Sequence, residues 1–248
     1  MSRRRRLAAL VASLGLTLTL SGEVLAEPTA VANAMFNEGV TAYKAGDVKA
    51  AVDDWSKAAD EGHPIAAYLV GQLYEQGRGV AQSDGLAFQY YKIAADAGHL
   101  EAMVKVGITY RDGNKAIGVK RDYQKALKLF ENGALAAFPE AQYELAGMYR
   151  HGLGVPVERS ESLRWLILAA KKHYVPSLLE LARIHFDGEG VDRNRVMGWA
   201  FLDLATRYAQ GEEQARVNAA KDKYAVRLSD TEKDAARQAA DDWLARHS

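Results

Sequence analysis

Residues 66–80 of the chain read AAYLVGQLYEQGRGV. This phrase returns at residues 102–119, at 141–155 and, in altered form, at 177–191. One position in each copy carries a ring: Tyr74, Tyr110, Tyr149 and His185. The rings follow one another at intervals of 36, 39 and 36 residues. Self-similarity at a period in this range is typical of a stacked helical solenoid, in which each repeat contacts its neighbours.

Each copy has the pattern of a helix followed by a tight turn. In the first copy the apolar residues at positions 0, +4, +7 and +8 form one helical stripe: Ala66, Val70, Leu73 and Tyr74. Ala66 and Gly71 are small, and we expect the backbone of another helix to approach them. Gly77 and Gly79 end the helix, because glycine permits the positive φ that a tight turn needs.

A second helix is expected at about residues 84–97. Small residues and one ring recur there with helical spacing: Ala87, Tyr91, Ala94 and Ala95. Because one helix pair cannot bury its own apolar face, successive pairs must stack on each other. The sequence therefore predicts an all-α fold, a right-handed superhelical α-solenoid of helix-turn-helix repeats.

Two further helices are expected after the last repeat. Residues 211–228 have one apolar side, and Ser229 and Glu232 form a capping box that opens a helix to about Arg246. The predicted inward side of that last helix is Ala236, Ala239, Ala240, Trp243 and Leu244. We interpret this pair as a cap on the final open face of the stack.

The N-terminus has the features of a secretory signal peptide. Residues 3–6 are arginines, residues 7–20 are apolar, and small residues precede a cleavage site that we place after Ala26. The alternative is an uncleaved membrane anchor, although a span needs about 20 apolar residues. Without residues 1–26, which hold four Arg and one Glu, the formal net charge falls from 0 to −3. A mildly acidic chain without a basic run has no electrostatic attraction to nucleic acid, and we expect no membrane insertion after cleavage.

Residues 34–211 resemble the Sel-1-like repeat, a relative of the tetratricopeptide repeat (TPR). The resemblance rests on the pattern A-x-x-x-L-G-x-x-Y-x-x-G-x-G-V followed by a helix that ends A-A-x-x-G. Residues 114–117 lengthen the glycine turn of the second full repeat by three residues. The resulting organisation is a signal peptide at 1–26, a leader and TPR-like opening unit at 27–64, repeats at 65–211 (65–100, 101–139, 140–175 and 176–211) and capping helices at 212–248.

The resemblance implies an adaptor that gathers partners in cell-envelope assembly or signalling. A cysteine-rich branch of the family has penicillin-binding or β-lactamase activity, but this chain has no cysteine, so that activity is not carried over. The opening unit, around Tyr43, Trp55 and Gly62-His63-Pro64, is similar to an exported subgroup. Members of that subgroup are periplasmic negative regulators of a sensor kinase that controls exopolysaccharide. The resemblance thus implies a periplasmic or secreted protein whose partner is an envelope protein or peptide, such as the periplasmic domain of a sensor kinase.

Motifs for catalysis, cofactors and metals are missing from the sequence. The Gly-x-Gly turns recur after helices, without the strand and the Lys-Ser/Thr of a nucleotide loop. The six histidines show no helical metal spacing, and His63 and His99 share one repeat position, which indicates a structural role. We therefore expect no enzyme activity, no cofactor and no metal site.

The remaining candidates for function are exposed residues of the repeats. Positions +2, +6 and +9 of the first helices miss the core stripe, and a solenoid lines its groove with such positions. From them we predict a protein-binding groove of Tyr68, Gln72, Glu75, Ile108, Arg111, Tyr143, Arg150, Arg183 and Phe186. Aromatic and arginine side chains are favoured at interfaces. Two alternatives stay open: Tyr68, Val104, Tyr143 and Leu179 pack between helices, or the loop edge at residues 114–117 is the binding surface.

Two functions fit these observations. The first is a non-catalytic exported scaffold that mediates protein–protein interactions in the envelope, with a regulatory role toward a sensor kinase or an exopolysaccharide pathway. The second is an envelope hydrolase or glycan-binding protein that acts on peptidoglycan or polysaccharide. The sequence leaves the partner, the pathway and the oligomeric state open. A pair of carboxylates facing each other across the groove would favour the second function.

Overall fold

A computed structural model describes residues 19–20, 23–24, 27–226 and 228–247. Two two-residue strands, β1 (Thr19–Leu20) and β2 (Glu23–Val24), pair antiparallel. All other regular elements of the described residues are helical: α2 (Ala30–Lys44), α3 (Val48–Asp60), α4 (Pro64–Gln76), α5 (Asp84–Asp96), α6 (Leu100–Asp112), the 3₁₀ helix η1 (Lys115–Ile117), α7 (Tyr123–Leu135), α8 (Pro139–His151), α9 (Arg159–Lys171), α10 (Val175–Asp187), α11 (Arg195–Tyr208), α12 (Glu212–Ala225) and α13 (Asp230–His247). The prediction of an all-α fold is confirmed.

The predicted signal peptide lies outside the described residues except for β1 and β2, and so does its cleavage site after Ala26. Within the predicted leader and opening unit at 27–64, α2 already begins at Ala30. The Oγ1 atom of Thr29 accepts a hydrogen bond from the Ala32 amide at 3.1 Å and caps this helix. None of the described helices is long and apolar enough to cross a membrane.

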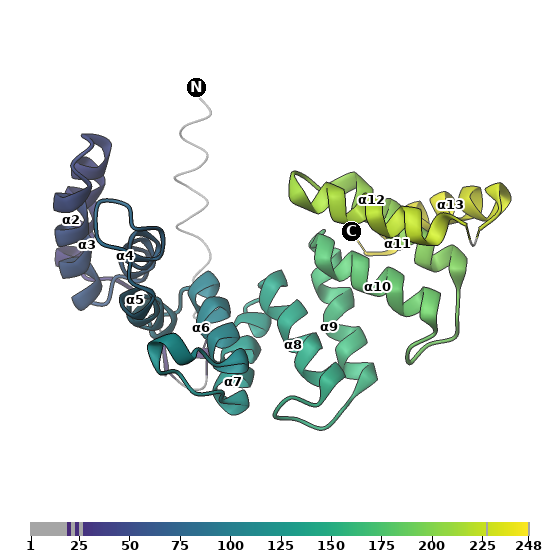
Figure 1. Ribbon diagram of the computed structural model, residues 1–248, viewed down its shortest axis with the longest axis horizontal. Helices are drawn as coiled ribbons and strands as arrows, with labels where there is room; N and C mark the ends of the chain where they lie inside the picture. Colours follow the sequence, from purple (N-terminus) through teal and green to yellow (C-terminus); the bar gives the residue numbers. More distant parts are fainter. Residues whose placement is uncertain (1–18, 21–22, 25–26, 227, 248) are drawn as a thin grey trace.

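The helices form antiparallel pairs that stack in one curved row from α2 to α13 (Figure 1). From α2 to α12 each helix packs against the next one along the chain, and α13 packs back against α11. The row is bent into an open arch, with α4 and α6 on its inner side and α5 and α7 on its outer side (Figure 1). This arrangement confirms the predicted α-solenoid.

The four predicted ring positions occupy equivalent places in the stack. In each repeat, the carbonyl of the ring residue accepts a hydrogen bond from the backbone amide of the residue that precedes the second helix. These bonds are Ser83 to Tyr74 (3.0 Å), Asp122 to Tyr110 (2.7 Å), Glu158 to Tyr149 (3.0 Å) and Asn194 to His185 (2.9 Å). One hydrogen bond thus closes the turn of every repeat, including the second, which contains the inserted residues.

The small residues inside the first helices make room for rings more than for backbone. A Cβ atom added to Gly71 would lie 2.7 Å from the ring of Tyr91 and 3.3 Å from the Ala87 backbone carbonyl oxygen. In the next repeat a Cβ atom on Gly107 would lie 2.5 Å from the ring of Phe130. The expected approach of a helix backbone is present at Gly71 through the Ala87 carbonyl of α5, and the ring of Tyr91 lies closer still.

Helices α12 and α13 cover the last repeat, as predicted for a cap. Tyr224 of α12 stacks on Phe186 of α10, and Trp243 of α13 packs edge-on against Phe201 of α11. Ala236, Ala240 and Trp243 are buried, while Ala239 and Leu244 of the predicted inward side pack at its margin. The capping box is also present, because Ser229 Oγ accepts from the Glu232 amide and a Glu232 carboxylate oxygen accepts from the Ser229 amide.

Candidate functional site

A ladder of ion pairs links the first helices of successive repeats. Positions are counted from the first small residue of each repeat, which is Ala66, Ala102, Ala141 or Ser177. The side chain at position +9 of one repeat reaches the side chain at position +3 of the next. The pairs are Glu75 with Lys105, Arg111 with Glu144, and Arg150 with Glu180. Each rung crosses the boundary between two repeats, so the ladder ties neighbouring units together.

The first rung has the opposite polarity to the other two. Lys105 Nζ lies 2.9 Å from a carboxylate oxygen of Glu75, and the Tyr91 hydroxyl donates a hydrogen bond to the same carboxylate at 2.7 Å. Burial acts to raise the pKa of Glu75, but the hydrogen bonds from Tyr91 and Lys105 lower it below its ordinary value. This carboxylate is therefore ionised and accepts hydrogen bonds from both Tyr91 and Lys105.

The second rung is centred on Arg111, which binds two carboxylates at once. Its Nε and Nη2 atoms donate to Asp112 at 2.8 and 3.0 Å, and its Nη1 atom donates to Glu144. Burial raises the pKa of Glu144 despite this partner, because Arg111 is shared with Asp112 and Glu140 adds negative charge nearby. The rung is thus a partly buried cluster in which one guanidinium serves two acids.

The third rung extends into a larger network at the start of the last repeat. Glu180 binds Arg150 of the preceding repeat and also accepts a hydrogen bond from Arg183 at 2.7 Å. Arg183 further binds Glu189 at 2.5 Å and Asp187 at 3.5 Å. All the arginines of the predicted groove are therefore already bound to carboxylates of this chain.

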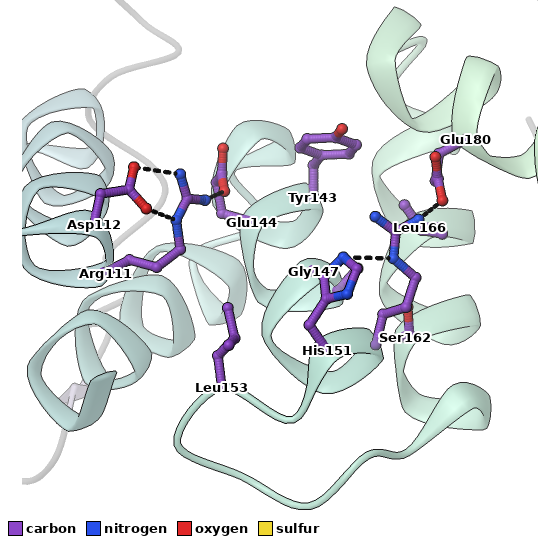
Figure 2. Close-up of a pocket in the computed structure, with 12 residues that line it drawn as sticks. Arg111, Asp112, Tyr143, Glu144, Gly147, His151, Leu153, Ser162, Leu166 and Glu180 are labelled. Atoms are coloured by element: carbon purple, nitrogen blue, oxygen red, sulfur yellow. Dashed lines mark hydrogen bonds and ion pairs between the residues drawn. The ribbon is translucent and has the colours of Figure 1, made fainter. Parts of the chain in front are cut away.

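A cavity of about 420 Å³ lies between the second and third rungs. Tyr143, Glu144 and Gly147 of α8 line it, together with Leu166 of α9 and Glu180 of α10. Figure 2 shows Glu144 with Arg111 on one side of this space and Glu180 on the opposite side, with Tyr143 and Gly147 between them. We call this space the Gly147 cavity.

Gly147 contributes to the open space of the cavity, because it has no side chain there. The equivalent position +6 carries a side chain in the other three repeats, where it is Gln72, Ile108 or Arg183. A Cβ atom added to Gly147 would meet no atom within 4 Å. A glycine inside a helix costs about 1 kcal/mol relative to alanine. Packing does not require this glycine, and what it provides is space.

The structure separates the predicted groove residues into groups. Arg111, Tyr143 and Arg150 line the Gly147 cavity. Glu75 and Ile108 line a second hollow of about 420 Å³ between α5, α6 and the loop before α7. Tyr68 and Gln72 lie half-buried on α4.

Phe186 was placed in the groove by its position, and that prediction is wrong. Its side chain is 1% exposed because the ring of Tyr224 covers it. Position +9 of the last repeat has no following repeat, and α12 takes that place.

The alternative that Tyr68, Val104, Tyr143 and Leu179 pack between helices agrees with their surroundings, and Leu179 packs partly buried against the core. Val104 is 1% exposed, Tyr68 stacks on His99 at 4.2 Å, and Tyr143 packs edge-on against Tyr174 at 5.7 Å. Tyr68 and Tyr143 keep partly exposed faces. Whether the groove binds a partner stays a prediction.

Sequence reasoning missed the acceptors of the ladder, Glu144 and Glu180, and the lysine Lys105. All three stand at position +3, and each has the opposite charge to position +9 of the preceding repeat. That alternation of sign was visible in the sequence and could have revealed the rungs. The open position +6 at Gly147 was named as a groove position but not recognised as a cavity.

His63 and His99, assigned a structural role, cap helices. His63 Nδ1 accepts a hydrogen bond from the Ala66 amide at 3.2 Å, and His99 Nδ1 accepts from the Ala102 amide at 3.4 Å. Burial lowers the pKa of both rings, which favours the neutral form that can accept. Among the described residues there is no cluster of three or more His, Asp or Glu arranged to hold a metal ion.

Comparison with known proteins agrees with this geometry. The family model described as Sel1 repeat matches residues 64–99, 100–137, 139–174 and 175–207, more than half of the chain. Two proteins named exopolysaccharide production negative regulator are similar to it. The one from Rhizobium leguminosarum bv. viciae is 28% identical over 180 residues, which are 68% of this chain and 67% of that protein. The one from Rhizobium meliloti is 29% identical over 183 residues, which are 69% and 67%.

A solved structure has a similar fold. The crystal structure of a Sel1 repeat protein from Oxalobacter formigenes superposes with a TM-score of 0.58 at 30% identity. The superposition covers 73% of this chain and 72% of that protein.

Proposed function

Because the chain belongs to the Sel1 repeat family, we propose that it is a non-catalytic scaffold that binds a segment of another protein on the face formed by its first helices. The observation that carries this proposal is the Gly147 cavity. Its walls are two ion-pair rungs that already hold their side chains in place, so a guest meets a preformed site. Preorganisation of this kind reduces the entropy cost of binding.

The cavity suits a single anchoring side chain of the partner. Tyr143 offers an aromatic wall, Leu166 and Ala146 offer an apolar floor, and carboxylate oxygens lie at the edges. Interfaces draw most of their affinity from a few such anchors in desolvated pockets. The rest of the first-helix face would contribute shape and register.

The named relatives support a role in regulation. Two of them are negative regulators of exopolysaccharide production. By analogy, the protein acts in the cell envelope after export, in the periplasm, and its partner is another envelope protein, such as the periplasmic domain of a sensor kinase in an exopolysaccharide pathway. This analogy rests on sequence similarity and is part of the proposal.

A hydrolase is the less favoured function. Glycoside hydrolysis needs one carboxyl group held protonated and a second as base or nucleophile. Glu144 and Glu180 line opposite sides of the cavity, but each accepts a hydrogen bond from an arginine. Carboxylates held by guanidinium groups fit a structural ladder better than proton transfer, so the binding function is favoured.

Site-directed photo-crosslinking in live cells tests the proposal. A photoreactive phenylalanine derivative placed at Tyr143 should give a defined crosslinked partner on irradiation. The same residue placed at exposed Leu135, at the end of α7, serves as the control. A partner captured equally well from both positions, or from neither, would contradict the assignment.

A variant that fills the cavity provides a second test of the proposed function. Gly147→Leu places a side chain into open space, so the fold should be retained while crosslinking from Tyr143 falls. A double substitution of Arg111 and Arg150 is less suitable as a test. It would also break two rungs of the ladder and destabilise the stack.

A further inference from the structure

The arginines of the first-helix face form ion pairs with carboxylates of this chain, whereas, in the part of the chain that the structure describes, four cations in and next to one loop do not. Arg111, Arg150 and Arg183 are each bound to carboxylates. Lys115, Lys120, Arg121 and Lys128 form no ion pair within the described residues. All four are exposed. They lie in the loop between α6 and α7 and on the first two turns of α7.

This loop contains the three-residue insertion, and it is well ordered. Asn114 and Val119 form an antiparallel bridge with hydrogen bonds of 2.8 and 2.9 Å. The Asn114 side chain accepts from the Ala116 amide at 3.1 Å, and Gly113 and Gly118 supply positive φ values of 73°. The cations therefore project from a hairpin that its own backbone hydrogen bonds close.

Most charged residues of the segment 113–128 are positive. The segment holds five cations, Lys115, Lys120, Arg121, Lys125 and Lys128, and one acid, Asp122. Asp122 is the N-cap of α7 and binds Lys125 at 3.1 Å. The nearest preceding acid, Asp112, is bound by Arg111. The other repeat loops hold fewer cations: residues 77–83 contain Arg78 alone, residues 152–158 contain none, and residues 188–194 contain Arg193 with two acids, Glu189 and Asp192.

Neighbouring groups leave the cations facing solvent. The side of the loop that faces α5 presents Ile117, whose Cγ2 atom would lie 3.9 Å from a Cβ on Gly85. Arg121 lies over the ring of Tyr123 at 5.7 Å, and Lys125 lies over the ring of Tyr110 at 5.1 Å. Lys115, Lys120 and Arg121 also surround a shallow hollow of about 630 Å³ within the loop. This hollow has room for side chains of an incoming chain.

We propose that the 113–121 hairpin and the first two turns of α7 form a docking site for an acidic segment of a partner protein, in addition to the Gly147 cavity. The inference rests on the proposed scaffold function and names a second contact and its chemistry. Asp112 lines both the Gly147 cavity and the hollow in the loop, so one partner can span the two. Two linked contacts raise the effective affinity through effective concentration.

Charge and surface chemistry favour a protein segment over other polyanions. The chain as a whole is not basic, whereas nucleic acid binding relies on an extended run of phosphate contacts. A membrane site of this size would gain from an exposed large apolar residue, but Ile117 is turned toward α5 and Ala116 is small. The three cations of the hairpin and the two on the first turns of α7 match a short run of Asp and Glu.

The test compares two triple charge reversals in the chain from residue 27 onward. One carries Lys115→Glu, Lys120→Glu and Arg121→Glu. The control carries Lys49→Glu, Lys172→Glu and Arg216→Glu, which are exposed, lie elsewhere and change the net charge equally. The probe is a short fluorescein-labelled peptide of glutamate and serine, and fluorescence anisotropy reports its binding at low and physiological ionic strength. Circular dichroism checks that both variants fold.

The hairpin reversal should raise the Kd for the acidic peptide by about tenfold or more, and the control should leave it within about twofold. Equal loss in both variants, or no loss in either, would overturn the inference. Preferential binding of vesicles containing phosphatidylglycerol over the peptide would overturn it in favour of a membrane site.

The two proposals can fail separately. If the partner captured through Tyr143 is recovered undiminished from the hairpin variant, the scaffold function stands and the acidic docking site does not. If no partner is captured but the peptide binds the hairpin, the reverse holds.

Discussion

Phe186 and Tyr224 stack with their ring centroids 3.9 Å apart and their planes 3° apart. This contact joins the last repeat to the cap, at the position where earlier repeats use an ion-pair rung. In the stack, position +9 of a repeat meets the next first helix. When the next helix is α12, an aromatic pair replaces the charged one. The ladder therefore ends in an apolar contact that seals the final face of the solenoid.

Removing that contact should release the cap. Tyr224→Ala should destabilise α12 and α13 by about 3 kcal/mol, the cost of truncating a large buried ring. Limited proteolysis should then cut residues 209–230 faster, and a separate early urea transition should be visible, because repeat proteins lose units from their ends. Tyr224→Phe keeps the ring and should leave the cap docked. Unchanged proteolysis in Tyr224→Ala would show that the cap docks without the contact between the rings of Phe186 and Tyr224.

Gly147 and Gly107 should respond oppositely to alanine. Gly147→Ala should stabilise the protein by about 1 kcal/mol, because helix propensity improves and the new Cβ meets open space. Gly107→Ala should destabilise it, because the Cβ would lie 2.5 Å from the ring of Phe130. The urea midpoint of each variant, compared at an unchanged m value, checks both predictions. A stability gain at both positions would contradict the packing described here.

The second rung should show coupling between its members. Arg111→Met leaves Glu144 partly buried without its guanidinium and should cost about 1–3 kcal/mol. Glu144→Met in the same chain should recover part of that loss, because it removes the uncompensated charge. A double-mutant cycle from urea denaturation measures the coupling. A coupling free energy near zero would mean that Asp112 alone satisfies Arg111.

The histidine caps should make the N-terminal repeats sensitive to acid. His63 Nδ1 accepts a hydrogen bond only when neutral, and burial lowers its pKa below the ordinary value of 6.5. The unfolded chain therefore binds a proton more readily, so stability is lost as the pH falls below about 6.5 toward the lowered pKa. A positive charge at a helix N-terminus is also unfavourable. Glu101 lies 3.3 Å from His99 and offsets part of the effect there, so His63 should dominate.

His63→Asn checks this explanation, because asparagine caps helices and does not titrate. Thermal denaturation between pH 5 and 7.5 should show a smaller slope for His63→Asn than for the native protein, with the two curves separating as the pH falls below about 6.5. Parallel slopes would assign the acid sensitivity to other groups.

Several features of the fold could be predicted because they depend on local sequence. The turn glycines, the helix starts at residues 84 and 230, and the capping box at Ser229 are set by residues within a few positions of each other. The start of α2 at Ala30 was not predicted, because Thr29 is a single capping residue without a box. At Gly71 the small residue was noticed, but the group that fills its space is Tyr91, on a separate helix.

The candidate site could be predicted only in part. Counting positions within each repeat predicted that Arg111, Tyr143 and Arg150 lie on one face. In the structure they line one cavity. Counting could not tell that both arginines are already bound, because Glu144 is 33 residues from Arg111 and Glu180 is 30 residues from Arg150. The acidic partners lie in the next repeat, and only the rotation between repeats brings them within reach.

The sequence by itself determined the repeat register and the helix boundaries, because glycine turns, small-residue slots and capping residues act over short distances along the chain. Tertiary structure alone decided which surface groups remain available. It buried Phe186 under a helix that begins 26 residues later, paired the groove arginines across repeats, and left Gly147 facing open space. Those outcomes depend on how one repeat is rotated against the next, and stacking geometry sets that rotation.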